Sequence, residues 1–257
     1  MTHRPEKTTG PVVSGGRARP AFPAPAALTL RLLLTLIIWS VAGASALAQH
    51  GQGAQAQAHQ LRRSADIKEY LEHLDRPDRD QYQKPAQVME ALALKPGMAV
   101  ADLGSGSGYF TRRFVEAVTD SGKVYAIDVE PEMLDYVKES LDHMHVPYTA
   151  EFLLARPDNS KLPVASVDLI FICNVFHHLE DRVKYFVNIR SALKPGGRIA
   201  IIDFYHDERS GDVGFPREHL VARETVVEEM TKAGYTLRRE HTFLPRQYFL
   251  EFQPTGS

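Results

Sequence analysis

A glycine-dense turn constrains this 257-residue chain more than any other feature. Residues 100–110 read VADLGSGSGYF, an apolar run that ends in Asp102 and continues into three alternating glycines. Glycine permits positive φ and has no Cβ, so a ligand can lie close to the main chain. The first N–H groups of a following helix have no partner inside that helix. The segment therefore predicts a strand, a ligand-binding turn and a helix in succession.

The spacing of the glycines narrows the class of ligand. A dinucleotide-binding turn has the form G-x-G-x-x-G, and counting from Gly104 and Gly106 its third glycine falls on Tyr109, which is too bulky for close helix–strand contact. A Walker-type phosphate loop is also excluded, because no Gly-Lys-Ser/Thr follows the glycines. The pattern that remains is D-x-G-x-G-x-G.

Two further segments continue this pattern. The strand-like run 123–128, KVYAID, ends in Asp128 roughly 20 residues after the glycines, where a ribose-binding acid lies in a βαβ unit. The alternative is a solvated aspartate that begins the turn before Pro131. The segment 155–163, ARPDNSKLP, precedes an apolar strand at 167–173, and its Asp158 is either a ligand or a turn-forming residue.

With these motifs in order, and LKPGGRIAIID at 193–203, the chain resembles the class I S-adenosylmethionine-dependent methyltransferases, most closely the type 11 and ubiquinone-biosynthesis-like group, over roughly residues 80–252. The resemblance implies an α/β fold, a Rossmann-like, doubly wound, seven-stranded, mostly parallel sheet with an antiparallel last strand. It also implies S-adenosyl-L-methionine as cofactor. The cofactor-binding residues expected from it are Asp102, Gly104, Ser105, Gly106, Gly108, Asp128, Val129, Asp158, Asn159 and Asn174.

The order of segments agrees with that fold. From Met98 onward strands and helices alternate, which is typical of a parallel sheet covered on both faces. Near the end, 235–243 and 247–252 read as two strands with a link too short for a parallel pair, so they are expected to be antiparallel. Upstream, apolar residues spaced as one face of a helix at 67–74 predict a helix able to lie across the cofactor cleft.

In the resembled family an acid ahead of a Leu-Pro pair accepts a hydrogen bond from the adenine amino group, and Asp158 occupies that place, although the chain reads Pro-Asp-Asn where Gly-Asp-Ala is commoner. Ligands of parallel sheets bind beyond the carboxyl ends of the strands. His177 and His178 follow such a strand end and are the candidate catalytic bases, because a free imidazole titrates near neutrality. The alternative is that both cap or pack the following helix.

The expected function is methyl transfer from S-adenosylmethionine to a small-molecule acceptor, with residues 64–84 and 205–219 forming the acceptor pocket. The alternative is a non-catalytic S-adenosylmethionine-binding, sensing or interaction module at the membrane. No compact ligand motif is present, so no metal site is predicted. The single cysteine, Cys173, excludes an internal disulfide framework.

The N-terminal region carries a separate signal. Arginines precede the apolar run LLLTLIIWSV at 32–41, and Ala46-Leu47-Ala48 has the small-x-small form of a signal-peptidase site. Residues 1–48 are thus predicted to be a signal peptide or a membrane anchor, 49–63 a flexible linker and 64–257 the methyltransferase domain. Export to the periplasm or the extracytoplasmic membrane face follows, the alternative being a cytoplasmic protein with a misassigned start.

Charge argues against an extended nucleic-acid partner. Residues 1–48 hold five basic and one acidic side chain, and the remainder of the chain holds 25 basic against 31 acidic ones. A body without a basic stripe lacks the main electrostatic driving force for binding DNA or RNA. A small methyl acceptor is therefore favoured, with membrane association possible only through the N-terminal segment. The oligomeric state is not predicted.

Overall fold

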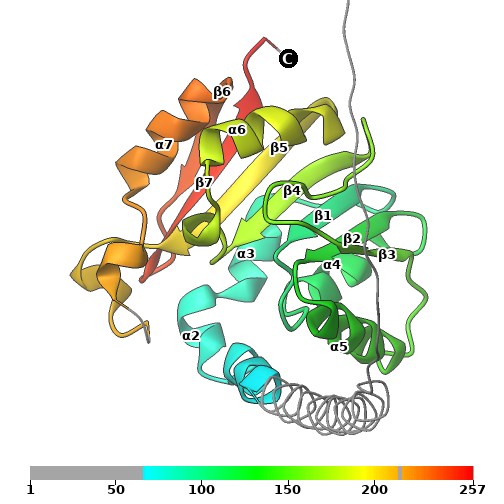
Figure 1. Ribbon diagram of the computed structural model, residues 1–257. Coiled ribbons are helices and arrows are strands. Elements are labelled where there is room, and N and C mark those ends of the chain that lie inside the picture. Colours follow the sequence, from blue (N-terminus) through cyan, green and yellow to red (C-terminus); the bar gives the residue numbers. More distant parts are fainter. Residues whose placement is uncertain (1–65, 214–215, 257) are drawn as a thin grey trace, which may run out of the picture. The chain divides into compact units, whose positions relative to one another are not determined.

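One seven-stranded sheet organises the computed structural model, which describes residues 66–213 and 216–256. Its strand order is β3-β2-β1-β4-β5-β7-β6 (Figure 1). The strands are β1 (Ala99–Leu103), β2 (Lys123–Asp128), β3 (Ala150–Leu154), β4 (Val167–Cys173), β5 (Leu193–Phe204), β6 (Tyr235–His241) and β7 (Gln247–Pro254).

Strand direction confirms the fold class predicted from the sequence. The strands β3, β2, β1, β4 and β5 pair in parallel, whereas β7 is antiparallel to both β5 and β6. Parallel neighbours need a long crossover, which the intervening helices supply, while the short link from β6 to β7 permits only the antiparallel arrangement. The carboxyl ends of β1, β2, β4 and β5 consequently meet at one edge of the sheet.

Prolines begin two of the helices. Pro85 and Pro131 each occupy the first turn of a helix, where the missing N–H costs nothing. The helices are α2 (Arg79–Gln83), α3 (Pro85–Leu92), α4 (Thr111–Val118), α5 (Pro131–Asp142), α6 (Arg182–Ile189) and α7 (Arg223–Lys232), and residues 66–74 are helical as well. Short 3-10 turns cover Phe176–His178, Arg190–Ala192, Glu208–Ser210 and Arg217–His219.

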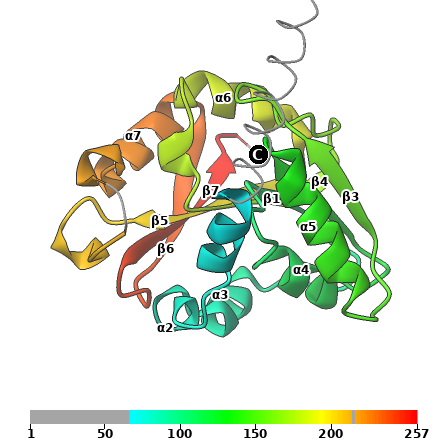
Figure 2. The same cartoon turned by 60° about the horizontal axis from the view of Figure 1, so that its bottom comes forward.

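Helices cover both faces of the sheet, so the core has two layers. On one face, α6 and α7 pack through residues such as Phe186 and Met230. On the other, α3, α4 and α5 pack through residues such as Leu92, Phe114 and Val137. Figures 1 and 2 show the two groups of helices on opposite sides of the strands. Because the central strands are buried on both faces, their sequences read as continuous apolar runs.

Two local features interrupt the regular elements. Strand β5 begins at Leu193, because Val167 pairs with Leu193 and Leu169 with Arg198, so residues 194–197 bulge out of the ladder at the double glycine. The charged stretch after residue 74 contains the five-residue helix α2, which starts at Arg79.

The predicted signal peptide or anchor (1–48) and the linker (49–63) lie outside the described residues. Within residues 66–213 and 216–256, no helix has the length and apolar character needed to cross a membrane. Export of the chain therefore stays a prediction.

The core layer between the sheet and helices α3, α4 and α5 gives a first test. Phe171 on β4 is fully buried and its ring lies 4.7 Å from that of Phe110 and 5.1 Å from that of Phe114, centroid to centroid. Replacing Phe171 by Ala should lower the free energy of unfolding by about 3–5 kcal/mol, through lost burial and the cavity left behind. Urea unfolding followed by circular dichroism measures the change. The control Val187→Ala, at a side chain 51% exposed on α6, should change it by less than about 0.5 kcal/mol.

Candidate functional site

The glycine turn after β1 is held by main-chain bonds to the end of β2. The N–H groups of Gly104 and Ser105 both donate to the carbonyl of Ile127, at 2.8 and 2.9 Å. The N–H of Gly106 donates to Oδ2 of Asp128 at 2.9 Å. Three successive N–H groups thus fasten the turn to one neighbouring strand end, which fixes the path of the main chain along the pocket.

Gly104 is required at its position for two reasons. Its φ is +74°, in the left-handed region that side chains rarely adopt. A Cβ there would also lie 2.3 Å from Cγ2 of Val175, on the loop after β4. The backbone of the turn can approach that loop only because Gly104 has no side chain.

Asp102 lies beneath the turn and outside the lining of the pocket. It is 3% exposed and accepts a hydrogen bond of 2.6 Å from Oγ1 of Thr111, at the start of α4. Burial raises its pKa to about 6. Through this hydrogen bond Asp102 connects β1 to α4. A direct contact between Asp102 and a ligand stays a prediction.

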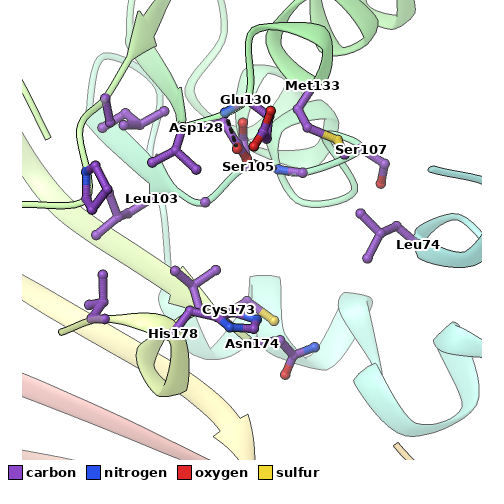
Figure 3. A pocket seen from close by; sticks show the side chains of 18 of the residues that line it. Leu74, Leu103, Ser105, Ser107, Asp128, Glu130, Met133, Cys173, Asn174 and His178 are labelled. Atoms are coloured by element: carbon purple, nitrogen blue, oxygen red, sulfur yellow. Dashed lines mark hydrogen bonds between the residues drawn. The ribbon is translucent and has the colours of Figure 1, made fainter. Parts of the chain in front are cut away.

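Asp128 lies at the carboxyl end of β2 and faces the pocket (Figure 3). Besides the bond from Gly106, its Oδ1 accepts from the N–H of Glu130 at 3.1 Å. Burial raises the pKa of its carboxyl, and the main-chain donors partly oppose that rise. Each carboxylate oxygen has a second lone pair, so a ligand can still donate to both.

A pocket of about 390 Å³ opens between the glycine turn, the end of β2 and the loop after β4. Figure 3 shows Ser105, Asp128 and Glu130 on one side and Cys173, Asn174 and His178 on the other. Its remaining lining residues include Tyr70, Leu74, Arg79, Leu103, Gly104, Gly106, Ile127, Val129, Met133, Arg156 and Pro157. The expected helix at 66–74 therefore does contribute side chains to this cleft.

A second pocket of about 620 Å³ adjoins the first and shares five lining residues with it, namely Tyr70, Leu74, Arg79, Asn174 and His178. It is formed by the helix at 66–74, α2, the ends of β4 and β5 and residues 212–213. The segments expected to form the acceptor pocket, 64–84 and 205–219, supply much of its lining. The two pockets therefore lie side by side, with shared residues between the glycine turn and the second chamber.

Asn174 directly follows β4 and has a left-handed backbone conformation. Its φ is +58°, which asparagine tolerates better than most residues, and its N–H donates to the carbonyl of Ile202 at 2.9 Å. Its side-chain oxygen accepts from Nε2 of Gln247 at 2.6 Å. The residue is thereby fixed where the two pockets join.

The structure separates the two histidines. Nδ1 of His177 lies 2.9 Å from both carboxylate oxygens of the fully buried Asp203, and its side chain is 2% exposed. His178 is more exposed and lines both pockets. Burial lowers the pKa of His178, and neighbouring His177 lowers it further. His178 is thus a neutral imidazole at pH 7, placed at the junction.

Asp158 and Asn159 lie away from the first pocket. The chain turns between Arg156 and Asn159, whose main-chain groups bond to each other at 2.9 and 3.0 Å. Arg156 and Pro157 line the first pocket, whereas Asp158 and Asn159 line a separate hollow beside α6. Val129, by contrast, lines the first pocket, and Gly108 does not. The cofactor roles assigned to all the expected residues stay predictions.

Several lining residues were not expected from the sequence. Met133 on α5 and Pro157 add apolar surface, and Arg79 adds a buried positive charge. Met133 could have been predicted from its position, because it lies in the first turn of α5, next to the end of β2. Arg79 could not, because it stands in a run of alternating charges where every side chain reads as solvated.

Comparisons with known proteins agree with one another. A family model for a methyltransferase domain matches residues 101–201. The chain is 28% identical over 117 residues to the ubiquinone/menaquinone biosynthesis C-methyltransferase UbiE of Enterobacter sp. (strain 638), covering 46% of this chain and 47% of that protein. The chain thus aligns with about half the length of the curated relatives that it matches.

Solved structures extend the similarity over more of the chain. A SAM dependent methyltransferase from Aquifex aeolicus superposes with a TM-score of 0.66 at 31% identity, covering 71% of this chain and 95% of that one. A putative type 11 methyltransferase from Sulfolobus solfataricus superposes with a TM-score of 0.53 at 23% identity, covering 66% and 89%, which supports the fold alone.

The buried Asp102 predicts a pH-dependent stability. Its pKa is 3.8 in the reference state and about 6 in the fold. Below about pH 3 it is protonated in both states and contributes nothing, whereas above about pH 7 it is ionised in both, and folding must bury the charge. At neutral pH this penalty is about 3 kcal/mol.

In the Asp102→Asn variant this titration is removed. Relative to wild type, its free energy of unfolding should rise by about 3 kcal/mol between pH 3 and pH 7, because only the wild type acquires the penalty. Urea unfolding across that range measures the difference. The control Asp135→Asn, at an exposed position of α5, should show a nearly constant difference. A constant difference for Asp102→Asn as well would contradict the raised pKa.

Proposed function

The chain belongs to the S-adenosylmethionine-dependent methyltransferases, and on this premise we propose that it transfers a methyl group from S-adenosylmethionine to a small-molecule acceptor. The observation that carries the proposal is the pocket between the glycine turn and Asp128, which shares five lining residues with a second chamber. A methyl transferase needs both, because donor and acceptor must meet in line with each other.

The residues of the first pocket fit the cofactor in size and chemistry. Its volume lies in the range of small-molecule sites. A Cβ on Gly106 would lie 3.1 Å from Cδ1 of Leu74, a pocket-lining side chain, so the glycine keeps this part of the cradle open. Asp128 offers two acceptor oxygens where a ribose would present two hydroxyls, and Met133, Pro157 and Ile127 supply apolar surface for a planar base.

When bound, S-adenosylmethionine supplies an activated methyl group: the acceptor's lone pair forms the new bond to carbon while the carbon–sulfur bond breaks and leaves its electron pair on sulfur. The protein itself positions the donor and the acceptor, excludes water and removes a proton from the acceptor. Leu74 and Tyr70 line the pocket from the helix at 66–74. The main chain of residues 104–106 gives a rigid floor because three hydrogen bonds fasten it.

His178 is the residue we assign to proton removal from the acceptor. It lines both pockets, and its lowered pKa keeps the ring unprotonated and able to accept at neutral pH. His177 is turned to Asp203 and contributes by packing, its ring centroid lying 4.0 Å from that of His178. An acceptor that is already ionised would not need this step.

Binding of the cofactor tests the proposal directly. Full-length protein should bind S-adenosylhomocysteine in calorimetry, and Asp128→Asn should weaken binding at least tenfold, because one acceptor oxygen becomes a donor amide. The matched control Asp135→Asn changes an exposed aspartate on α5 that lies outside the pocket and should leave the affinity unchanged. A folded wild-type protein that does not bind the nucleoside would contradict the proposal.

Turnover tests the role of His178. Transfer of labelled methyl groups to a panel of quinols, catechols, thiols and amines should identify an acceptor, and His178→Gln should then lower kcat about 100-fold while changing affinity for S-adenosylhomocysteine less than threefold.

The pH profile gives an independent readout of the same residue. Because the base must be unprotonated, the wild-type rate should fall as pH falls through a pKa below 6.5, and this limb should vanish in His178→Gln. His143→Gln, an exposed histidine after α5, should keep the wild-type profile. An unchanged profile in His178→Gln would mean that the acceptor loses its proton elsewhere.

A further inference from the structure

Arg79 is a buried guanidinium at the boundary between the two pockets. It is 8% exposed and lines both of them. An arginine is charged at every pH at which the protein folds, and a buried charge is costly unless it is paired. The surroundings of Arg79 therefore show whether the fold itself compensates this charge.

The fold compensates it only in part. One nitrogen, Nη1, donates to the carbonyl of Leu74 at 2.8 Å, and the guanidinium carbon lies 3.9 Å from the ring centroid of Tyr109. Nε is buried and bonds to none of the described residues. No carboxylate of residues 66–213 or 216–256 lies within ion-pairing distance of it, although other arginines of the chain have such partners.

Neighbouring groups hold Arg79 in this place. It is the first residue of α2, and the next residue, Asp80, accepts a hydrogen bond from the hydroxyl of Tyr109. The ring of Tyr109 is thereby fixed against the guanidinium on one side, and Arg113 lies over the same ring at 4.2 Å. The charge of Arg79 also reaches the pocket lining: burial raises the pKa of Cys173 to about 12, and Arg79 is the largest influence that opposes this rise.

The acids around the second pocket do not neutralise Arg79. Asp66, Glu69 and Asp212 line that pocket, but each is solvent-exposed, whereas Arg79 is buried. Tyr82 and Phe204 lie beside it and give aromatic surface, their ring centroids 5.9 Å apart. The chamber thus combines a fixed cation with aromatic walls.

We propose that Arg79 is the anion-binding residue of this site and that it pairs with an anionic oxygen of a bound ligand. This inference rests on the proposed function, which supplies two such oxygens: the carboxylate of the amino-acid part of the cofactor, and an ionised oxygen on the acceptor, of the phenolate or carboxylate kind. Either one completes the guanidinium's hydrogen bonds, and charge-assisted bonds of this type are about twice as strong as neutral ones.

Three probes on full-length protein distinguish the two oxygens. S-adenosylhomocysteine carries the carboxylate, 5′-methylthioadenosine lacks it, and 4-nitrophenol reports its own ionisation by colour. If Arg79 holds the cofactor carboxylate, Arg79→Gln should weaken S-adenosylhomocysteine at least tenfold and leave methylthioadenosine unchanged. If Arg79 holds the acceptor, the wild type should lower the pKa of bound nitrophenol by about one unit, and Arg79→Gln should abolish that shift while both nucleosides bind normally.

The matched control is Arg113→Gln, which removes the other arginine on the Tyr109 ring and lines neither pocket. It should match wild type with all three probes. Arg79→Lys, which keeps a positive charge, should recover part of the lost effect and serves if the glutamine variant does not fold.

The proposal is wrong if the Arg79 variants bind all three probes as wild type does and wild type shows no preference for nitrophenolate. Failure of the proposed function is a different result, in which wild type binds neither nucleoside. In that case the nitrophenol titration, run with and without nucleoside, still measures whether Arg79 binds an anionic oxygen.

Discussion

The site depends on the attachment of the glycine turn to the end of β2. Two N–H groups bond to the carbonyl of Ile127 and a third to the carboxylate of Asp128, so the turn and the acid are one hydrogen-bonded unit. Gly104 makes this attachment possible, because its backbone is left-handed and a side chain there would collide with Val175 on the loop after β4. Loss of that fit would displace the floor of the pocket and the acid beside it together.

This arrangement follows from the order of the strands. β1 lies between β2 and β4, so the turn after β1 is flanked by Asp128 on one side and by Asn174 on the other. The same edge receives the end of β5, where Asp203 fixes His177. The first pocket and the second chamber therefore share residues at this edge of the sheet, and the helix at 66–74 and the loop after β5 complete the lining of the second chamber.

Sequence alone predicted the framework well and the outer wall poorly. Hydrophobic runs and turn residues specify elements locally, which is why the sheet and its reversed strand agreed with expectation. The direction of a side chain in a loop is not local. Asp158 occupies the expected place in its motif, yet the turn from Arg156 to Asn159 directs it toward α6, and Asp102 lies under the turn because Thr111 draws it there. Arg79 gave no signal at all, since its burial depends on Tyr109, 30 positions later.

The buried charged side chains of the site differ in how many hydrogen bonds the rest of the chain makes to them. Asp102 and Asp203 receive hydrogen bonds from neighbouring groups of the chain and serve to hold elements together. Asp128 receives two and keeps lone pairs toward the pocket. Arg79 donates to one carbonyl, lies against an aromatic face and interacts with the Cys173 thiol, which is less than a guanidinium with five donors can use. Since an incompletely paired buried charge destabilises the free protein, its retention beside a pocket is best explained by a ligand group that completes it, and so the binding energy of that ligand includes relief of a cost already present in the fold.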